Sequence, residues 1–428
     1  MSEAINLANF DEKFMREFYE AALQIAEKKI QEGEAYLRDN PPSRKLLPRI
    51  ATGGGFSGLF LWDSAFCCIW AKHEPKRFPI TTTLDNFYLL QDEDGYICRE
   101  FQADGKPYWS RKHPVSFNPP ILSWAELELF EHGVTDVERL KKVFPHLKKH
   151  FDFCWRNYRR SEDGLFFGDA LGSGMDNLPR QPIGCDFDIH GGIDIKLEHV
   201  LADNKRIWEM LKTRTLYCWN RQMGWIDYSS QMAFNAANLA KIAAAIGAED
   251  EAIRLRDKFA EMKQIINEQC YDPERGFYFD CYKGEVIPRY HAGAFWALLS
   301  GIVPAERVEA VCRVICDEKI FNRPIPFPSL AACEKEYDPE NGYWLGSSWP
   351  PTTYVGIRGL QAMGRGDLAL DFARRYYNAN AELFRVSGTV WENISPEQCR
   401  QPKGHSGSSF CGWGALAPVA IYKEFLQK

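Results

Sequence analysis

Apolar residues recur along most of this chain at the three- and four-residue spacing of amphipathic helices. In the first run, residues 11–38, Phe14, Phe18 and Ile25 fall on one helical face, and Pro41 follows as a stop signal. The same spacing predicts further helices at about 62–74, 79–92, 119–133, 136–159, 193–214, 228–247, 249–270, 289–300, 304–317, 351–364, 366–384 and 412–426. We therefore expect about 13 helices.

Strand signals are few and local. Residues 271–276 read Tyr-Asp-Pro-Glu-Arg-Gly and precede the aromatic-rich segment 277–280, which predicts a turn leading into a short hairpin. Related turns followed by aromatic residues occur at 92–97, 161–167 and 338–343. The chain therefore alternates helix pairs with small turn-and-hairpin segments.

No linker divides these helices, because the chain has no Pro/Ser/Gly-rich stretch, charge block or low-complexity tract. We predict a single catalytic domain over residues 1–428 with an all-α fold. About 12 helices in six pairs suit an (α/α)6 barrel, a toroid of inner and outer helices with short β-hairpins in its loops. The ends of the inner helices would line one central pocket, which is a natural place for a concave site.

Composition indicates an ordinary globular protein and argues against several partners. The 428 residues are 45% hydrophobic and 26% charged, with a formal net charge of −6. Such a surface attracts neither nucleic acid nor an anionic membrane. No apolar run reaches the length of about 18 residues that predicts a membrane span. The N-terminus lacks the basic and apolar regions of a signal peptide, so we expect a cytoplasmic protein. The oligomeric state stays open, a homo-oligomer included.

The cysteines do not predict a metal site or a disulfide scaffold. There are 13 of them, scattered along a long chain, and most are expected to be buried reduced thiols. Cys312 and Cys316 lie one helical turn apart but have no nearby His or Cys partner. We therefore expect no metal and no cofactor.

Two carboxylates stand in settings that suit catalysis. Asp176 lies in the loop sequence Gly-Ser-Gly-Met-Asp-Asn-Leu-Pro of residues 172–179, whose glycines allow a close approach to a ligand. Glu392 lies between a Trp and an Asn. Local sequence leaves alternatives open: a helix cap or Asx-turn for Asp176, and a surface residue near a strand end for Glu392.

Aromatic content gives this pair of acids a chemical context. Phe, Trp and Tyr make up 14% of the chain, with 13 tryptophans. Most belong to the core, but aromatic faces also stack on the apolar face of a sugar ring. Hydrolysis of a sugar bond needs two acids, one to protonate the leaving oxygen and one to activate water.

Three further segments suit a pocket. Trp62 and Asp63 lie in the apolar run 59–66, where a lone acid needs partners. Asp63 could accept hydrogen bonds from sugar hydroxyls while Trp62 packs beside the ring; the alternative is a helix N-cap. Asn118 and Trp349 each precede a Pro-Pro pair, a pattern that predicts the start of a helix. Each of the two residues would then lie just before the first turn of its own helix.

Taken in order, these segments resemble the clan of inverting (α/α)6 glycosidases formed by the trehalases of family 37 and glycoside hydrolase family 63. The chain is most similar to the short bacterial-type mannosylglycerate and glucosylglycerate hydrolases. The resemblance covers most of the chain and rests on Leu61-Trp62-Asp63-Ser64, Asn118-Pro119-Pro120, Ser173-Gly174-Met175-Asp176-Asn177, Gly346-Ser347-Ser348-Trp349-Pro350-Pro351, Trp391-Glu392-Asn393 and Gly412-Trp413-Gly414.

The resemblance implies roles for these residues. Asp176 falls on the general acid of the family and Glu392 on its general base. The substrate-binding residues implied by the same segments are Trp62, Asp63, Asn118, Asn177, Trp349, Trp391 and Trp413.

Two departures put the identity of the sugar or of the aglycone in doubt. Asn118 stands where family members often have Gln, and Leu345 stands where they often have Arg. Loss of that Arg removes a cation and several hydrogen-bond donors. Arg99, Arg180 or Arg289 could replace the charge.

We therefore expect an inverting α-glycosidase acting on a small α-glucoside or α-mannoside, such as mannosylglycerate, glucosylglycerate or a short oligosaccharide. Its two carboxyls would stand roughly 6.5–9.5 Å apart to admit water. One alternative is a sugar epimerase or isomerase, which needs a pair of histidines; His190, His291 and His405 lie in suggestive loops but form no paired pattern. The other is a non-catalytic carbohydrate-binding protein.

Residues 94–117 combine aromatic and charged side chains in a loop. A pocket of this kind works best when bulk water is excluded. We therefore predict that this loop is a lid.

Overall fold

The computed structural model describes residues 10–31, 46–56, 58–109, 111, 116–118, 120–169, 172–180, 223–403, 407–410 and 412–427. The α-helices in these ranges are α1 (Glu12–Glu27), α2 (Leu61–Ala71), α3 (Ile80–Leu89), α4 (Leu122–Glu131), α5 (Val137–Asn157), α8 (Ile226–Ala245), α9 (Glu249–Gln269), α10 (Phe295–Leu299), α11 (Val308–Ile315), α12 (Pro350–Ala362) and α13 (Gly366–Ser387). Short 3-10 segments are η3 (Ala292–Ala294), η4 (Ala305–Arg307) and η5 (Gly414–Leu416), and η6 (Ala417–Leu426) is a π-helix.

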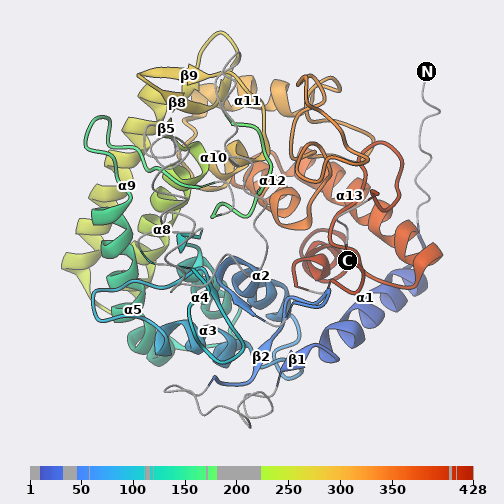
Figure 1. The fold of residues 1–428 in the computed structure, drawn as a ribbon, viewed down its shortest axis with the longest axis horizontal. Helices are drawn as coiled ribbons and strands as arrows, with labels where there is room; N and C mark the ends of the chain where they lie inside the picture. Colours follow the sequence, from blue (N-terminus) through green and yellow to red (C-terminus); the bar gives the residue numbers. More distant parts are fainter. Residues whose placement is uncertain are drawn as a thin grey trace, which may run out of the picture.

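The helices form two concentric rings. Successive inner segments contact one another in the order α2, α4, α8, α10, α12 and η5–η6, and η5–η6 contacts α2 again, which closes the inner ring. Around it lie α1, α3, α5, α9, α11 and α13 (Figure 1). This arrangement is the predicted all-α (α/α)6 barrel.

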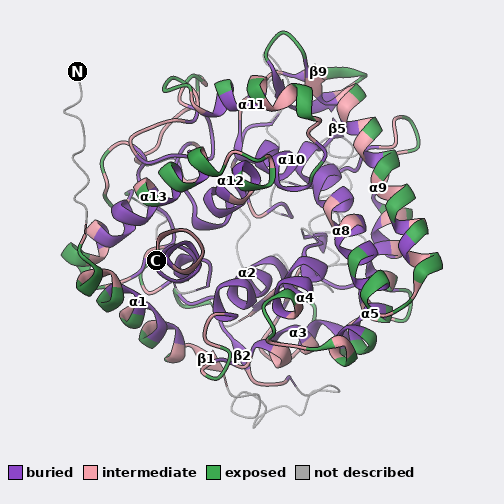
Figure 2. Cartoon of the chain, turned by 180° about the vertical axis from the view of Figure 1, so that it is seen from behind, coloured by how far each residue is buried: buried purple, intermediate pink, exposed green. Residues whose placement is uncertain are grey.

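Burial separates the two rings. Every residue of the mostly apolar helix α2 is buried, Asp63 and Ser64 included, whereas α9 buries one narrow stripe, Ala252, Leu255, Met262 and Ile266. A helix with an apolar face on all sides belongs inside the core, and an amphipathic helix belongs on its surface. Figure 2 shows the same division, with buried residues toward the centre and exposed residues at the rim.

The strands are short and antiparallel. Three two-stranded sheets pair β1 (Ile30–Gln31) with β2 (Arg49–Ile50), β3 (Leu59–Phe60) with β4 (Glu100–Phe101), and β6 (Tyr271–Asp272) with β7 (Phe277–Tyr278). In a three-stranded sheet, β8 (Asp280–Tyr282) lies between β5 (Met223–Gly224) and β9 (Glu285–Ile287). The hairpin predicted at 271–280 is confirmed by β6 and β7.

Three predicted helices need comment. The first ends at Glu27 and not near residue 38, because Ile30 pairs with Ile50 as a strand. The helix predicted at 193–214 lies outside the described residues. The last, at 412–426, is a 3-10 turn followed by a π-helix.

Buried ion pairs join α2, α4, α12 and η6 of the inner ring at the C-terminal end of α2. Lys72 Nζ lies 2.5 Å from Glu128 Oε2 of α4 and 2.8 Å from Glu424 Oε1 of η6. Arg358 of α12 bonds Glu128 at 2.7 Å. The N-terminus of α2, ~15 Å away at 1.5 Å per residue, faces the pocket described below. No helix among the described residues is long and apolar enough to cross a membrane.

Candidate active site

A pocket of about 840 Å³ opens where the loops at one end of the inner ring meet. Three carboxyls from distant parts of the chain share it: Asp63 and Glu392, which are buried, and Asp176, which is partly exposed. The lining comprises Thr52, Gly54, Gly55, Phe56, Gly58, Phe60, Trp62, Asp63, Arg99, Glu100, Gln102, Ala103, Asp104, Tyr108, Trp109, Asn118, Gly174, Asp176, Tyr343, Glu392, Phe410 and Trp413. The predicted acids therefore meet in one aromatic-rich cavity.

Asp63 lies in the first turn of α2, where the helix dipole favours negative charge. Burial nevertheless dominates and raises the pKa of its carboxyl to about 8. Trp62, one residue earlier, packs edge-on against Trp413 with ring centroids 5.6 Å apart. The Trp-Asp pair thus contributes an aromatic ring and a polar group to the same wall.

Asn118 joins the start of α2 to the loop that carries Asp176. Its Oδ1 accepts a hydrogen bond from the backbone N–H of Trp62 at 2.8 Å, and its Nδ2 donates to the carbonyl of Gly172 at 2.9 Å. Asn118 lines the pocket as expected, but both ends of its amide bond backbone groups. Its structural role is therefore to position two walls of the site.

The loop bearing Asp176 packs closely against the ring of Trp62. Gly174 has φ of +75°, and a Cβ at this position would lie 2.4 Å from Cζ2 of Trp62. Only glycine fits both the left-handed backbone and this contact. Burial raises the pKa of the Asp176 carboxyl to about 6, although the charge of Arg99 opposes the rise.

Asn177 secures the other side of this loop. Its Nδ2 donates to the carbonyl of Gly342 at 2.8 Å, and its Oδ1 accepts from the N–H of Trp344 at 2.9 Å. Between these two partners, Tyr343 lines the pocket with φ of +64°. Asn177 itself is not among the lining residues, so it lies behind the wall that it holds in place.

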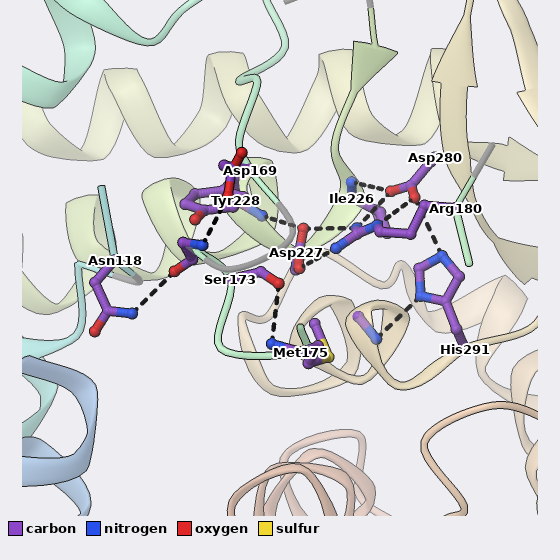
Figure 3. Close-up of polar contacts among 12 residues, drawn as sticks. Asn118, Asp169, Ser173, Met175, Arg180, Ile226, Asp227, Tyr228, Asp280 and His291 are labelled. Carbon is purple, nitrogen blue, oxygen red and sulfur yellow. Dashed lines mark hydrogen bonds and ion pairs between the residues drawn. The ribbon is translucent and has the colours of Figure 1, made fainter. Parts of the chain in front are cut away.

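Arg180 anchors the C-terminal end of the same loop (Figure 3). Its guanidinium is fully buried and forms two-point ion pairs with Asp227 (2.7 and 2.8 Å) and Asp280 (both bonds 2.8 Å). His291 Nε2 lies 3.1 Å from Asp280 Oδ2. These ion pairs hold the pKa of Arg180 above its usual range and that of Asp280 below its own. Arg180 is therefore structural and does not replace the missing family arginine.

Hydrogen bonds with Gly407 and Trp413 hold Glu392 in place. The backbone N–H of Gly407 donates to Glu392 Oε2 at 2.9 Å, the N–H of Glu392 donates to the carbonyl of Gly407 at 3.0 Å, and Trp413 Nε1 donates to the carbonyl of Glu392 at 3.1 Å. Burial raises the pKa of Glu392 to about 7; the Gly407 hydrogen bond opposes this and the charge of Asp176 adds to it. The two acids therefore interact electrostatically.

Trp349 and Trp391 lie away from the lining. Trp349 is fully buried and stacks on Trp344 with centroids 3.9 Å apart, while Trp413 packs edge-on against it at 6.0 Å. Trp391 directs its Nε1 to Ser387 Oγ at 2.9 Å. Trp349 supports the pocket wall from behind, whereas Trp413 faces the cavity, as Trp62 and Trp109 do.

Of the rim residues, sequence reasoning singled out Arg99 as a candidate cation but did not assign Glu100, Trp109 or Phe56 to the pocket. Segment 99–109 contributes Arg99, Glu100 and Trp109, and the loop after residue 51 contributes Phe56. The mixture of charged and aromatic residues at 94–117 was the available signal, and the lid function of this loop stays a prediction. Arg289, the remaining candidate to replace the family arginine, lies outside the lining and pairs with Glu336, with Arg289 Nη2 2.6 Å from Glu336 Oε1.

The arrangement suits acid–base chemistry on a carbohydrate. It combines two electrostatically coupled carboxyls of raised pKa, a third buried acid and several aromatic rings. Within the described part of the chain, no group of three or more His, Cys, Asp or Glu side chains could hold a metal ion.

The chain is similar in sequence to known glycosidases over much of its length. The chain is 23% identical over 380 residues to a periplasmic trehalase of Pseudomonas aeruginosa, covering 81% of this chain and 64% of that protein. It is 22% identical over 505 residues to a probable mannosyl-oligosaccharide glucosidase of Schizosaccharomyces pombe, covering 98% and 55%. The chain thus spans 55–64% of the length of these curated relatives.

Solved structures share the fold. A GH63 mannosylglycerate hydrolase from Thermus thermophilus in complex with glucose has a TM-score of 0.70 and 18% identity, covering 94% of this chain and 99% of that chain. Neutral trehalase Nth1 from Saccharomyces cerevisiae has a TM-score of 0.64 and 16% identity, covering 94% and 80%.

The model of one family, the mannosylglycerate hydrolase MGH1-like glycoside hydrolase domain, matches residues 58–410, which span the pocket from β3 to Phe410. This chain therefore belongs to the MGH1-like glycoside hydrolases.

Proposed function

We propose that this glycoside hydrolase cleaves a small α-glucoside or α-mannoside with inversion at the anomeric carbon, using Asp176 as general acid and Glu392 as general base. The observation that carries the proposal is the meeting of these two acids, 216 positions apart by their numbers (392 − 176), in one aromatic-lined pocket. Burial raises the pKa of both toward neutrality. Groups of this kind exchange protons efficiently at physiological pH.

The reaction needs two proton transfers. Asp176 gives its proton to the glycosidic oxygen as the bond from that oxygen to the anomeric carbon breaks. Glu392 takes a proton from water, whose oxygen bonds the anomeric carbon from the opposite face. The hydrogen bond from Gly407 N–H favours the ionised form of Glu392, which is the form a base requires.

Three further side chains are proposed to hold the sugar before the cleaved bond. Asp63 would bond its hydroxyls, while Trp62 and Trp413 offer aromatic surface. Asn118, Asn177, Trp349 and Trp391 would act from behind, by positioning these residues. Glucose bound to the Thermus thermophilus mannosylglycerate hydrolase is consistent with a hexose in such a pocket.

The rival functions have weaker support. An epimerase or isomerase would need histidines at the sugar, yet the described residues that line the pocket include none. His291 is bonded to Asp280, and His190 and His405 lie outside the described residues. A non-catalytic binding protein would bind sugar without turnover, and the test below separates it from an enzyme.

We also propose a cytoplasmic location. Ten cysteines in the described residues are free thiols, seven of them buried, including Cys67, Cys68 and Cys270. Reduced cysteines in this number suit a reducing compartment.

The test is a proton NMR time course with α-glucosides and α-mannosides, comparing the wild type with Asp176→Ala and Glu392→Ala. Early release of the β-anomer, reduced at least ~10²-fold in both variants, is expected. Asp163→Ala is the control, because it removes a carboxyl that lies outside this pocket and pairs with Arg160. Early α-anomer release, or full activity in either variant, contradicts the proposal.

A further inference from the structure

The rim of the pocket is built by two segments that pair through β3 and β4. Leu59 and Phe60 pair with Phe101 and Glu100, and the N–H of Leu61 donates to the carbonyl of Arg99 at 2.9 Å. The rim therefore starts directly at the N-terminus of α2, next to Asp63. A substrate whose sugar lies near Asp63, Asp176 and Glu392 must extend its second part past this rim.

Acidic side chains outnumber basic ones among the described residues that line the pocket. Among the described residues that line the pocket, five carry a carboxyl, Asp63, Glu100, Asp104, Asp176 and Glu392, and one carries a positive charge, Arg99. Leu345, at the position where the resemblance places an arginine, is not part of the lining and supplies no cation.

The guanidinium of Arg99 already interacts electrostatically with acids of the pocket. Its Nη2 lies 3.8 Å from Glu100 Oε2, with both side chains mostly buried, and its guanidinium lies 4.8 Å above the ring of Trp109. The same charge lowers the pKa of Asp63, of Glu100 and of Asp176 against the effect of burial. An additional anion in the pocket would compete with these acids for the charge of Arg99, which is the one cation among the described residues that line the pocket.

Uncharged surface is available at the rim. Phe56 is 50% exposed and meets Phe60 and Phe410 edge-on, with centroids 5.6 and 6.0 Å apart. Tyr108 and the amide of Gln102 line the same side. Aromatic faces beside neutral polar groups are suited to a sugar ring, which presents apolar C–H faces and hydroxyls.

We propose that the leaving-group part of the pocket takes a neutral sugar or polyol and rejects an aglycone that carries a carboxylate, such as glycerate. This inference rests on the glycosidase function proposed above and specifies its substrate class. The enzyme would accordingly cleave an α-glycosyl sugar or α-glycosyl polyol in preference to an α-glycosyl acid.

A matched substrate pair tests the inference. The α-glucosides of glycerol and of D-glycerate differ only in a CH2OH against a carboxylate, and the α-mannosides form a second pair. We expect kcat/KM to be at least ten-fold higher for the glycerol member of each pair. Raising the ionic strength should narrow the gap, because salt screens the repulsion of the anion.

The variant Glu100→Gln tests whether the rim charge causes the discrimination against glycerate. It removes one rim charge while retaining a hydrogen-bonding group for Trp109 Nε1, which donates to Glu100 Oε2 at 2.8 Å. The glycerol-to-glycerate ratio should fall by at least three-fold in this variant. Glu138→Gln is the control, because its exposed carboxylate pairs with Lys141 outside the lining, and its loss should leave the ratio unchanged.

The outcomes separate the two proposals. Equal or faster cleavage of the glycerate member overturns the charge inference and leaves the glycosidase function intact. If neither member is cleaved, calorimetric titration with sodium D-glycerate and with a neutral methyl α-glucoside decides the inference without turnover. Binding of glycerate alone overturns it, and binding of the neutral glycoside alone upholds it while the hydrolytic function fails.

Discussion

Asn118 and Asn177 hold the loop of Asp176 from its two sides, each through both ends of a single side-chain amide. Asn118 connects Trp62 N–H to the carbonyl of Gly172, and Asn177 connects Trp344 N–H to the carbonyl of Gly342. An amide suits both places, because it offers a donor and an acceptor at once. The position of the proposed acid is thus set by neutral groups that leave its pKa to burial and to nearby charges.

Replacing Asn177 with Asp should show whether the hydrogen bonds of this side chain, and not only its shape, position Asp176. The carboxylate keeps the shape of the side chain but loses the donor, so it would face the carbonyl of Gly342 and leave it unpaired. We expect kcat to fall by roughly ten-fold or more, from misplacement of Asp176, and the free energy of unfolding to fall by about 1–3 kcal/mol. Steady-state kinetics and urea denaturation measure the two effects.

Asn341→Asp serves as the control for this substitution. Asn341 is exposed and bonds only Asp338 among the contacts described for its side chain. Its replacement should leave kcat within two-fold of the wild type, on the order of the small effects of surface changes. Unchanged kcat in Asn177→Asp would show that the clamp does not position the acid.

The coupled acids predict a bell-shaped pH profile. In the free pocket the pKa of Asp176 is about 6 and that of Glu392 about 7, so the proton of the singly protonated pair lies mainly on Glu392. The working form has this proton on Asp176 and is the minor one of the two singly protonated forms. Below these values both acids are protonated and no base remains; above them both are ionised and no acid remains. We expect kcat/KM to be maximal between pH of about 6 and 7.

The same coupling can be measured without turnover. Because the charge of Asp176 raises the pKa of Glu392, Asp176→Asn should lower that pKa. A carbon-13 NMR titration of labelled glutamate side chains reports it, with Glu392→Gln identifying the signal. An unchanged Glu392 titration would mean that the two carboxyls do not interact.

Helix pattern, turn chemistry and ordered motifs were enough to predict much of this molecule. Helical spacing predicted the paired helices, the turn before Phe277 predicted the β6–β7 hairpin, and separate motifs anticipated that Asp176 and Glu392 share a site. These features are local, or are carried by short segments whose order is visible in the chain.

The rest depends on contacts between distant residues. Arg180 is paired with Asp227, 47 residues away, and with Asp280, 100 residues away, so nothing beside it in sequence marks it as an anchor. The end of α1 at Glu27 depends likewise on the pairing of Ile30 with Ile50. Local pattern could not distinguish Trp413, which faces the cavity, from Trp349, which supports it from behind.

Asp63 links the site to the pH dependence of stability. Burial raises its pKa from 3.8 to about 8, so the folded protein holds this proton more tightly than the unfolded chain. The resulting stabilisation is full below pH of about 4 and is lost as pH rises through about 8. Asp63→Asn has no charge to bury, so its melting temperature relative to wild type should rise between pH ~5 and ~9. Scanning calorimetry across this range checks the trend, and a constant difference between the two proteins would contradict it. Activity should fall in the variant, because an amide does not reproduce the hydrogen-bonding pattern of a carboxyl group toward sugar hydroxyls.

Gly174 offers a steric test of the wall between Trp62 and Asp176. Gly174→Ala adds a methyl group 2.4 Å from Cζ2 of Trp62, at a backbone φ of +75°. Gly133 has a similar φ of +71° but nothing within 4 Å of an added Cβ, so Gly133→Ala reports the cost of backbone strain alone. We expect that control to lose about 1 kcal/mol of stability with unchanged kinetics. Gly174→Ala should lose more and should raise KM at least ten-fold, because the ring of Trp62 must move within the pocket. Equal kinetics for the two variants would falsify the assignment of Trp62 to the sugar-binding wall.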